Sequence, residues 1–285
     1  DVASTTTKEM SALMVGREIS SGVIKRKHES KEEVLRVTGL TVVSDERVTL
    51  VDHAGFSVHA GEIVAIAGVS GNGQVEIADA IAGLMTISDG RIEIDGKDIT
   101  HASVRERTEA GISYIPEDRQ SVGLVLDFSL KENLCLKQYY QAPYSNSRGI
   151  LQFDEMDALG NRLIEEFDIR SSSGNDTVVR NMSGGNQQKA IVAREINLNS
   201  RLFIFVQPTR GLDVGAIEAI HRRIDELRAQ GKAILLVSLE LDEIMELADT
   251  IIVMYNGNIQ TTRKASELTK LQVGEYMMGV HVEKK

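Results

Sequence analysis

Cysteine, tryptophan and proline are nearly absent from this sequence, which contains one Cys, no Trp and three Pro in 285 residues. The single thiol, Cys135, excludes a disulfide within the chain and is typical of a reducing compartment. We expect it to be a core or helix-face residue. Basic residues are also in the minority, because 32 Lys and Arg stand against 42 Asp and Glu, for a net charge of −10. This charge argues against a nucleic-acid partner held by bulk electrostatics.

Long apolar runs are missing as well. No stretch approaches the roughly 18–20 residues that a helix needs to cross a bilayer. Residues 1–20 also lack the basic segment and the continuous apolar core of a signal peptide. If the protein acts at a membrane, we therefore expect other subunits to cross it. Hydrophobic residues, at 42%, are nevertheless sufficient for the core of one large domain or two modest ones.

A glycine-rich turn lies in the stretch "AIAGVSGNGQVEIADAIAGL", residues 65–84, between a strand-like run and a periodic helix. This layout is typical of the phosphate-binding loop G-x-x-x-x-G-K-[ST]. The glycines have the correct spacing, but Gln74 occupies the lysine position and Val75 the hydroxyl position. The candidate nucleotide-binding residues of this loop are Gly68, Ser70, Gly71, Asn72, Gly73 and Gln74.

The remaining pattern is mixed α/β. Strand-like segments at 34–43 and 55–68 are followed by a helix, and "GRIEIDGKDI" predicts a hairpin. Residues 129–168 are predicted to be mainly helical. The runs "RLFIFV" and "KAILLVS" flank another helix and are continuously apolar, which indicates strands of a parallel sheet that is buried on both faces. The sequence therefore predicts an α/β core with a helical insert.

A second glycine-rich helix start occurs in "NMSGGNQQKAIVAREI", residues 181–196. Ser183, Gly184 and Gly185 precede an amphipathic helix, whose first backbone N–H groups have no partner within the helix. Such an end carries a partial positive charge and binds anions. A serine cap with flexible glycines is the alternative for this tripeptide alone. The following "NQQK" and the spacing to "QPTRGLD" favour the anion site.

MSGGNQQK followed by QPTRGLD resembles the signature and D-loop of ABC transporter ATPases, and "YIPEDR" lies where this family has its Q-loop. "PTRGLDVGA" and "VSLELDEI" are most similar to the second half of importer subunits that carry two ATPase domains and serve simple sugars or nucleosides. The resemblance covers Val34 to Gly279. It implies a P-loop (RecA-like) parallel-sheet core, an antiparallel β subdomain and an inserted helical signature subdomain at about 125–190.

Two short segments near the ends are similar to each other. "SALMVGRE" and "GEYMMGVH" pair Met14 with Met277 and Gly16 with Gly279. Coincidence is the alternative for so short a match. As a repeat, it predicts a tail of a preceding domain at 1–16, a linker at 17–33, a nucleotide-binding domain at 34–280 and a terminal tail at 281–285. The chain is then the second half of a duplicated protein.

The resemblance also identifies departures from the family. Gln74 stands where the family has the lysine that binds phosphate, and Val75 and Val206 stand at the two positions that bind Mg²⁺. Gln207 replaces the base, and Leu239 replaces the residue that senses the γ-phosphate. Glu117 occupies the Q-loop glutamine position. A hydrogen bond to a charged group contributes about 1.5–3 kcal/mol, so losing the lysine alone weakens phosphate binding about ten- to a hundredfold. We predict no catalytic residue and no metal site in this loop, with weak or no ATP binding by the chain alone.

In the family, two ATPase domains meet head to tail, and each ATP lies between one P-loop and the opposite signature. The resemblance therefore implies that this chain caps ATP with Mg held by the first, N-terminal domain of the same subunit. The residues of the cap are Ser183, Gly184, Gly185, Asn186 and Gln187, with Asp213 in the D-loop position. Further implied partners are transmembrane permease subunits, which contact the region after Glu117, and indirectly an extracytoplasmic substrate-binding protein. The expected location is the cytoplasmic face of the cell membrane.

Three other functions remain as alternatives. The chain could be a purely regulatory docking module for the permease, a soluble ABC protein of ribosomes or DNA, or a working NTPase with an unusual metal site. The acidic charge argues against the second, and four simultaneous replacements argue against the third. The histidines show no metal-ligand spacing. Residues 221–232 predict a solvated helix face ending at Gly231, and Glu240, Asp242 and Glu243 predict a charged helix start.

Overall fold

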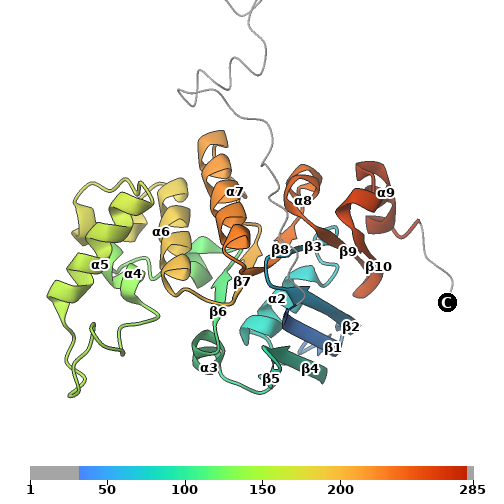
Figure 1. Cartoon of the computed structure of the whole chain (residues 1–285), viewed down its shortest axis with the longest axis horizontal. Helices are drawn as coiled ribbons and strands as arrows, with labels where there is room; N and C mark the ends of the chain where they lie inside the picture. Colours follow the sequence, from blue (N-terminus) through green and yellow to red (C-terminus); the bar gives the residue numbers. More distant parts are fainter. Residues whose placement is uncertain (1–31, 281–285) are drawn as a thin grey trace, which may run out of the picture.

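The computed structural model describes residues 32–280 (Figure 1). The predicted tails at 1–16 and 281–285 and nearly all of the predicted linker lie outside these residues. The linker prediction is one residue too long, because Glu33 already belongs to strand β1 (Glu33–Val43) and its side chain accepts hydrogen bonds from Arg36 and Ser57. The described chain contains no helix that is long and apolar enough to span a membrane.

The centre of the molecule is a six-stranded sheet with the order β10-β9-β3-β8-β7-β6. Its strands are β3 (Ile63–Ala67), β6 (Ile112–Ile115), β7 (Leu202–Val206), β8 (Ala233–Ser238), β9 (Thr250–Tyr255) and β10 (Asn258–Lys264). All neighbours are parallel except β9 and β10. Every residue of β3, β7 and β8 is buried. The predicted parallel sheet with two covered faces is confirmed.

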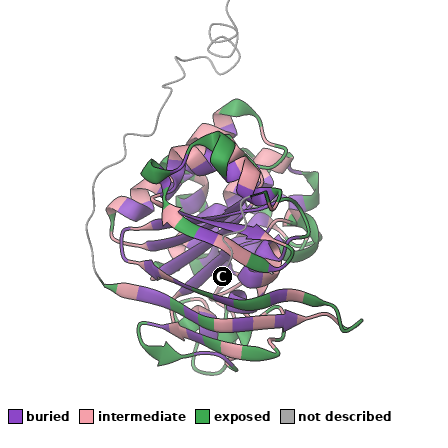
Figure 2. Cartoon of the chain, turned by 90° about the vertical axis from the view of Figure 1, so that its right-hand side faces the viewer, coloured by how far each residue is buried: buried purple, intermediate pink, exposed green. Residues whose placement is uncertain are grey.

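A second, antiparallel sheet covers one face of the first. Its order is β2-β1-β4-β5, with β2 (Thr49–His59), β4 (Asp89–Ile94) and β5 (Lys97–Asp98) in addition to β1. Together with helix α2 (Gln74–Ala82) it forms one hydrophobic cluster with the even-numbered residues of β3 and β7. In Figure 2, buried residues (purple) occur in strands of both sheets. The predicted hairpin is the β4–β5 pair, and the antiparallel subdomain is confirmed.

The helical insert extends from the edge of the sheet that β6 forms (Figure 1). It contains α4 (Leu130–Cys135), α5 (Phe153–Glu166) and the start of α6 (Gly184–Asn197), whereas α3 (Val104–Glu109) precedes β6. Single turns of other helix types occupy Arg119–Gly123, Gly174–Asp176 and Val179–Asn181. The prediction of a mainly helical 129–168 is correct at both ends, but residues 136–152 contain no regular helix. Cys135 is buried as predicted, and burial raises the pKa of its thiol to about 11.

The opposite face of the large sheet is covered by α6, α7 (Val214–Ala229), α8 (Leu241–Leu247) and α9 (Lys270–Met277), and a further turn lies at Ala265–Glu267. The predicted solvated face at 221–232 is wrong. Ile224 and Leu227 belong to the core, and the cation of Arg228 is buried because its guanidinium donates to Asp225 at 2.6 Å and to Asp249 at 3.4 Å. Gly231 follows the end of the helix with a φ of 80°.

Candidate nucleotide loop, signature and docking surface

The glycine-rich loop lies between β3 and α2, as predicted, and its backbone conformation and packing require glycine. Gly71 and Gly73 have φ values of 84° and 98°, which favour glycine. A Cβ on Gly73 would also lie 2.5 Å from the carbonyl oxygen of Leu50. Asn72 is buried, and its Oδ1 accepts the N–H of Asn256 at 2.9 Å. The loop therefore holds β2 and the turn after β9 in place, whether or not it binds a nucleotide.

Gln74 fills the position of the missing lysine from inside the loop. Its side chain is fully buried, and Nε2 donates to the carbonyl oxygen of Val69 at 3.0 Å and more weakly to that of Gly68 at 3.4 Å. Its Oε1 is buried and accepts no hydrogen bond from the described residues. A neutral amide thus closes the loop through the loop's own carbonyl groups, without supplying a positive charge.

The side chains at the other replaced positions are all uncharged. Val206 ends β7 with no exposed surface, and the partly buried Val75 packs against the same hydrophobic cluster. Gln207 has a φ of 46°, and its N–H donates to Val237 at 2.7 Å. Leu239 is half-buried between β8 and α8. Residues 32–280 contain no group of three His, Cys, Asp or Glu that could hold a metal ion.

The signature forms the start of α6, with Ser183 as the N-cap. The hydroxyl of Ser183 accepts from the side-chain amide of Asn186 at 2.9 Å and from its backbone N–H at 3.4 Å. The Oδ1 of Asn186 accepts the N–H of Arg170 at 2.8 Å. Gly184 and Gly185 are partly exposed, so the positive end of this 14-residue helix is open at the surface.

Gln187, which the sequence predicts to continue the cap, points into the protein. Its side chain is buried, because Nε2 donates to the carbonyl oxygen of Val179 at 2.9 Å and Oε1 accepts from Gln120 at 3.4 Å. Gln187 therefore joins α6 to the turn at Val179–Asn181, which precedes the signature. The ligand-binding roles of Ser183 and Asn186 stay predictions.

A groove of about 720 Å³ joins the signature to the D-loop position. Asp213 caps α7 by accepting the N–H of Ala216 at 2.9 Å, and it lines this groove together with Ser183 and Gly185. Basic side chains on its walls are Arg170, Lys189, Arg222 and Arg223. The loop at 68–74 does not line it. The signature and the loop of the same chain are thus separate sites.

Residues 51–210, more than half of the chain, match the family model described as ABC transporter. The chain belongs to the ABC transporter family. The fold agrees, since the structure resembles a nucleotide-free ATP-binding cassette from an ABC transporter, with a TM-score of 0.72 and 22% identity over 88% of this chain and 100% of that one. A dimeric bacterial ABC transporter cassette gives a TM-score of 0.69 at 20% identity, covering 81% of this chain and 98% of that one.

Three import proteins are similar in sequence to this ABC domain. The guanosine import ATP-binding protein NupO of Bacillus subtilis is 47% identical over 98% of this chain and 54% of its own length. The nucleoside import protein NupA of Lactococcus lactis is 42% identical over 97% and 54%. The ribose import protein RbsA of Caldanaerobacter subterraneus is 35% identical over 96% and 53%. The chain therefore spans about half the length of these relatives.

The Q-loop position of this ABC domain contacts the D-loop segment. The carboxylate of Glu117 forms an ion pair with Arg210, and Arg119 donates to the carbonyl oxygen of Arg210 at 3.1 Å. The added negative charge at 117 is thus neutralised within the chain. This contact joins the segment after β6 to the turn that ends at Asp213.

Sequence reasoning underestimated Glu243. The predicted charged helix start is correct, since Glu240 precedes α8 and Asp242 is exposed in its first turn. Glu243, however, is buried, and its Oε1 accepts from Thr209 and contacts Nε2 of His221, each at 2.9 Å. Glu243 lies one residue before Ile244 and four residues before Leu247, which are both core residues. This spacing could have predicted that Glu243 lies near the buried face of the helix.

A smaller cavity of about 160 Å³ lies between the core of the ABC domain and its helical insert. Leu84, Val104, Val122, Lys137 and Arg194 are among its lining residues. Of these, Leu84, Val104 and Val122 expose 49%, 43% and 55% of their surface. An apolar rim around a cavity is typical of a protein–protein contact. It lies in the region after Glu117 where the sequence predicts permease contacts.

Proposed function

We propose that this chain is the second nucleotide-binding domain of an ABC importer ATPase, that it does not hydrolyse ATP in its own loop, and that its signature completes the ATP site of a partner domain. One observation carries the proposal. The amide of Gln74 closes the phosphate loop from inside, whereas the helix start at Ser183 is open in a separate groove. One half of an ATP site is thus blocked and the complementary half is accessible.

The loss of charge in the loop supports the non-hydrolysing part of the proposal. Phosphoryl transfer depends on positioned cations, and positions 74, 75 and 206 supply no cation, no carboxylate and no hydroxyl. Glutamine at 207 cannot remove a proton from water. We infer that the reacting ATP and its Mg are held by the partner domain, with Ser183 and the following N–H groups of α6 at the terminal phosphate.

The proposed partners are inferred from the length of the relatives and from the exposed apolar residues of this chain. Relatives of twice this length have room for the N-terminal nucleotide-binding domain that the proposal requires. The exposed Val122, Val125 and Phe128 suit an apolar segment of a transmembrane permease, which would place the domain at the cytoplasmic face of the membrane. An extracytoplasmic binding protein would deliver the cargo. Similarity to guanosine, nucleoside and ribose import proteins favours nucleosides or simple sugars as that cargo.

A titration of ATP with Mg against the chain alone tests the proposal. We expect weak or undetectable binding and no steady release of phosphate. Replacing Gln74→Lys restores one cation, which should tighten binding about tenfold or more. Gln141→Lys adds the same charge at an exposed glutamine of the helical insert and should change nothing. Sub-micromolar affinity with sustained turnover by the unmodified chain would contradict the proposal.

The regulatory docking module remains a second candidate, because the cavity beside Val122 suits docking under either function. The two differ in what the signature does. A docking module needs the surface around Val122 and Phe128, but not an open helix start at Ser183. Full retention of ATP hydrolysis by the complete subunit after a change at Ser183 would favour the docking module.

A further inference from the structure

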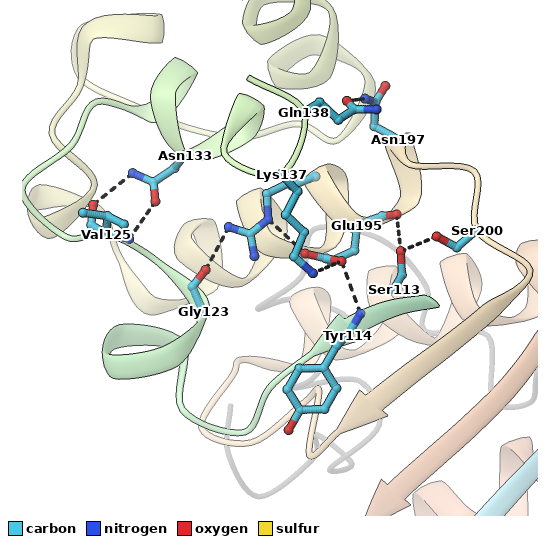
Figure 3. A network of polar contacts seen from close by, with 11 residues as sticks. Ser113, Tyr114, Gly123, Val125, Asn133, Lys137, Gln138, Glu195, Asn197 and Ser200 are labelled. Carbon is cyan, nitrogen blue, oxygen red and sulfur yellow. Dashed lines mark hydrogen bonds and ion pairs between the residues drawn. The ribbon is translucent and has the colours of Figure 1, made fainter. Parts of the chain in front are cut away.

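Glu195 and Glu243 are both buried in this ABC domain, but their partners differ. Glu195, in the last turn of α6, accepts hydrogen bonds from Nζ of Lys137 at 2.8 Å, from Nε of Arg194 at 2.9 Å and from the backbone N–H of Tyr114 at 3.2 Å (Figure 3). Burial alone would raise the pKa of this carboxyl, but Lys137 and Arg194 hold it below its ordinary value. Two cations thus neutralise Glu195 inside the protein, where it joins α6 to β6.

Glu243, in the first turn of α8, is not neutralised in this way. Its Oε1 accepts the hydroxyl of Thr209 and contacts Nε2 of His221, each at 2.9 Å. Its Oε2 is buried and accepts no hydrogen bond from residues 32–280. No lysine or arginine of the described chain forms an ion pair with it. Because apolar replacements of buried ionic groups are often neutral or stabilising, stability alone is a poor explanation for a carboxylate at this position.

His221 holds the carboxylate of Glu243 from α7. Its imidazole is buried, and Nδ1 lies 3.7 Å from Oε2 of Glu246, so the ring lies between two carboxylates of α8. An ionised carboxylate oxygen only accepts hydrogen bonds, and Nε2 is therefore the donor in the contact with Glu243. A second helix thus fixes the direction in which Glu243 presents its oxygen to Thr209.

Thr209 belongs to the turn that connects β7 to α7 and ends at Asp213. Glu243 contacts this turn from α8, and Nε2 of the buried Gln188 contacts it from α6, donating to the carbonyl oxygen before Thr209 at 2.9 Å. The N–H of Leu212 bonds back to the carbonyl oxygen of Thr209 at 3.2 Å, which closes the turn directly before Asp213. Asp213 then caps α7 and lines the groove of the signature.

We propose that Glu243 and Thr209 are positioning residues that set where Asp213 stands in the signature groove. Their hydrogen bond fixes the turn, and the turn fixes the capping aspartate at the start of α7. The inference rests on the proposed function, since it concerns the same composite ATP site. It also gives α8 a role in that site, although Leu239 stands where the family carries its sensor before this helix.

Two variants of Thr209 test the proposal in the complete two-domain subunit, with kcat and KM for ATP measured by steady-state phosphate release. Thr209→Val keeps the shape of the side chain and loses the hydroxyl. We expect kcat to fall about tenfold, less than the roughly 100-fold that a displacement of about 1 Å can cost. KM should stay within about twofold, because the partner domain holds the ATP. Thr209→Ser keeps the hydroxyl and loses the methyl group, so it should retain kcat.

Two further changes separate positioning from stability. Thr100→Val removes another buried hydroxyl, which accepts the N–H of Ile92 at 3.0 Å in the antiparallel sheet. It leaves that N–H unpaired and so lowers stability, but kcat should not change. Glu243→Met removes the acceptor of Thr209 and should lower kcat as Thr209→Val does. The double variant should lose no more than either single variant, because both remove the same bond. If the variants at Glu243 do not fold, the two Thr209 variants and Thr100→Val decide the test.

The outcomes separate this inference from the proposed function. An unchanged kcat in Thr209→Val overturns the positioning role. An equal loss in Thr209→Ser also overturns it, because the methyl group rather than the bond would then matter, and an equal loss in Thr100→Val overturns it as general destabilisation. Losses that multiply in the double variant remove Glu243 from the proposal. The proposed function fails separately, if Ser183→Arg leaves kcat unchanged. If Ser183→Arg stops hydrolysis and Thr209→Val does not lower it, only the positioning role fails.

Discussion

The loop before α2 and the first turn of α6 are both glycine-rich helix starts, but the fold requires glycine in only one of them. Gly73 has a left-handed φ of 98°, and a Cβ there would meet the backbone at 2.5 Å. At Gly184 and Gly185 the nearest atoms to an added Cβ are 3.5 and 4.0 Å away. Neither residue is among the positive-φ glycines of the described chain.

This difference changes what a glycine-rich motif indicates. Gly73 is explained by the packing of the loop against Leu50, so the loop can keep its form after losing the charges that hold phosphate. Glycine lowers stability by roughly 0.5–1 kcal/mol relative to alanine inside a helix, and this is the upper bound for the first two residues of α6. Gly184 and Gly185 bear this cost without a packing reason inside the described chain. A close approach by something outside the chain explains them better.

The largest effect is expected from Ser183→Arg in the complete two-domain subunit. Under the proposed function, an arginine side chain would occupy the groove in front of α6 and displace the terminal phosphate of the partner's ATP. We expect ATP hydrolysis to fall about 100- to 1000-fold, as for the loss of an electrostatic contact to the reacting group. Steady-state phosphate release is the measurement. Ser266→Arg, in an exposed turn after β10, is the matched control and should be silent. Full activity of Ser183→Arg would contradict the proposal that the helix start at Ser183 contributes to an ATP site.

The second prediction concerns stability at the closed loop. Gly73→Ala should lower the free energy of unfolding by about 2–3 kcal/mol, the sum of a left-handed alanine and overpacking against Leu50. Gly71→Ala is the matched comparison. Its φ is also positive, but nothing lies within 4 Å of the added Cβ, so about 1–2 kcal/mol is expected. Urea unfolding measures both. Equal losses would mean that packing does not explain Gly73.

Local patterns in the sequence were sufficient to predict both helix starts and the sheet. The alternation and continuity of apolar residues identify strands, and the glycines before residues 74 and 186 identify turns. The buried polar side chains could not be predicted in this way. Gln187, Glu195 and Glu243 are ordinary polar residues of helices, and their burial depends on partners that lie far away in the sequence. Lys137 and Glu195, for example, are 58 positions apart.

The same reason explains the wrong solvated face of α7. Arg228 is charged, and the sequence alone places it at the surface. In the structure, Asp225 and Asp249 neutralise it. Asp225 is one helical turn away and suggests a surface pair, whereas Asp249 immediately precedes β9. Only the fold brings Asp249 close to Arg228. With both carboxylates beside it, the guanidinium of Arg228 can be buried under α7.

The smallest effect is expected from Gly185→Ala, and it tests the open site most directly. The residue lines the groove, and an added methyl group would meet only Cβ of Ala216, at 4.0 Å. We therefore expect the free energy of unfolding to stay equal or to rise by up to about 1 kcal/mol, because alanine is the better helix former. In the complete subunit the same methyl group would lie where the partner's phosphate approaches, so ATP hydrolysis should fall while stability does not. A variant that is both as stable and as active as the parent would show that nothing approaches α6 closely. The glycine would then need another explanation than a composite ATP site.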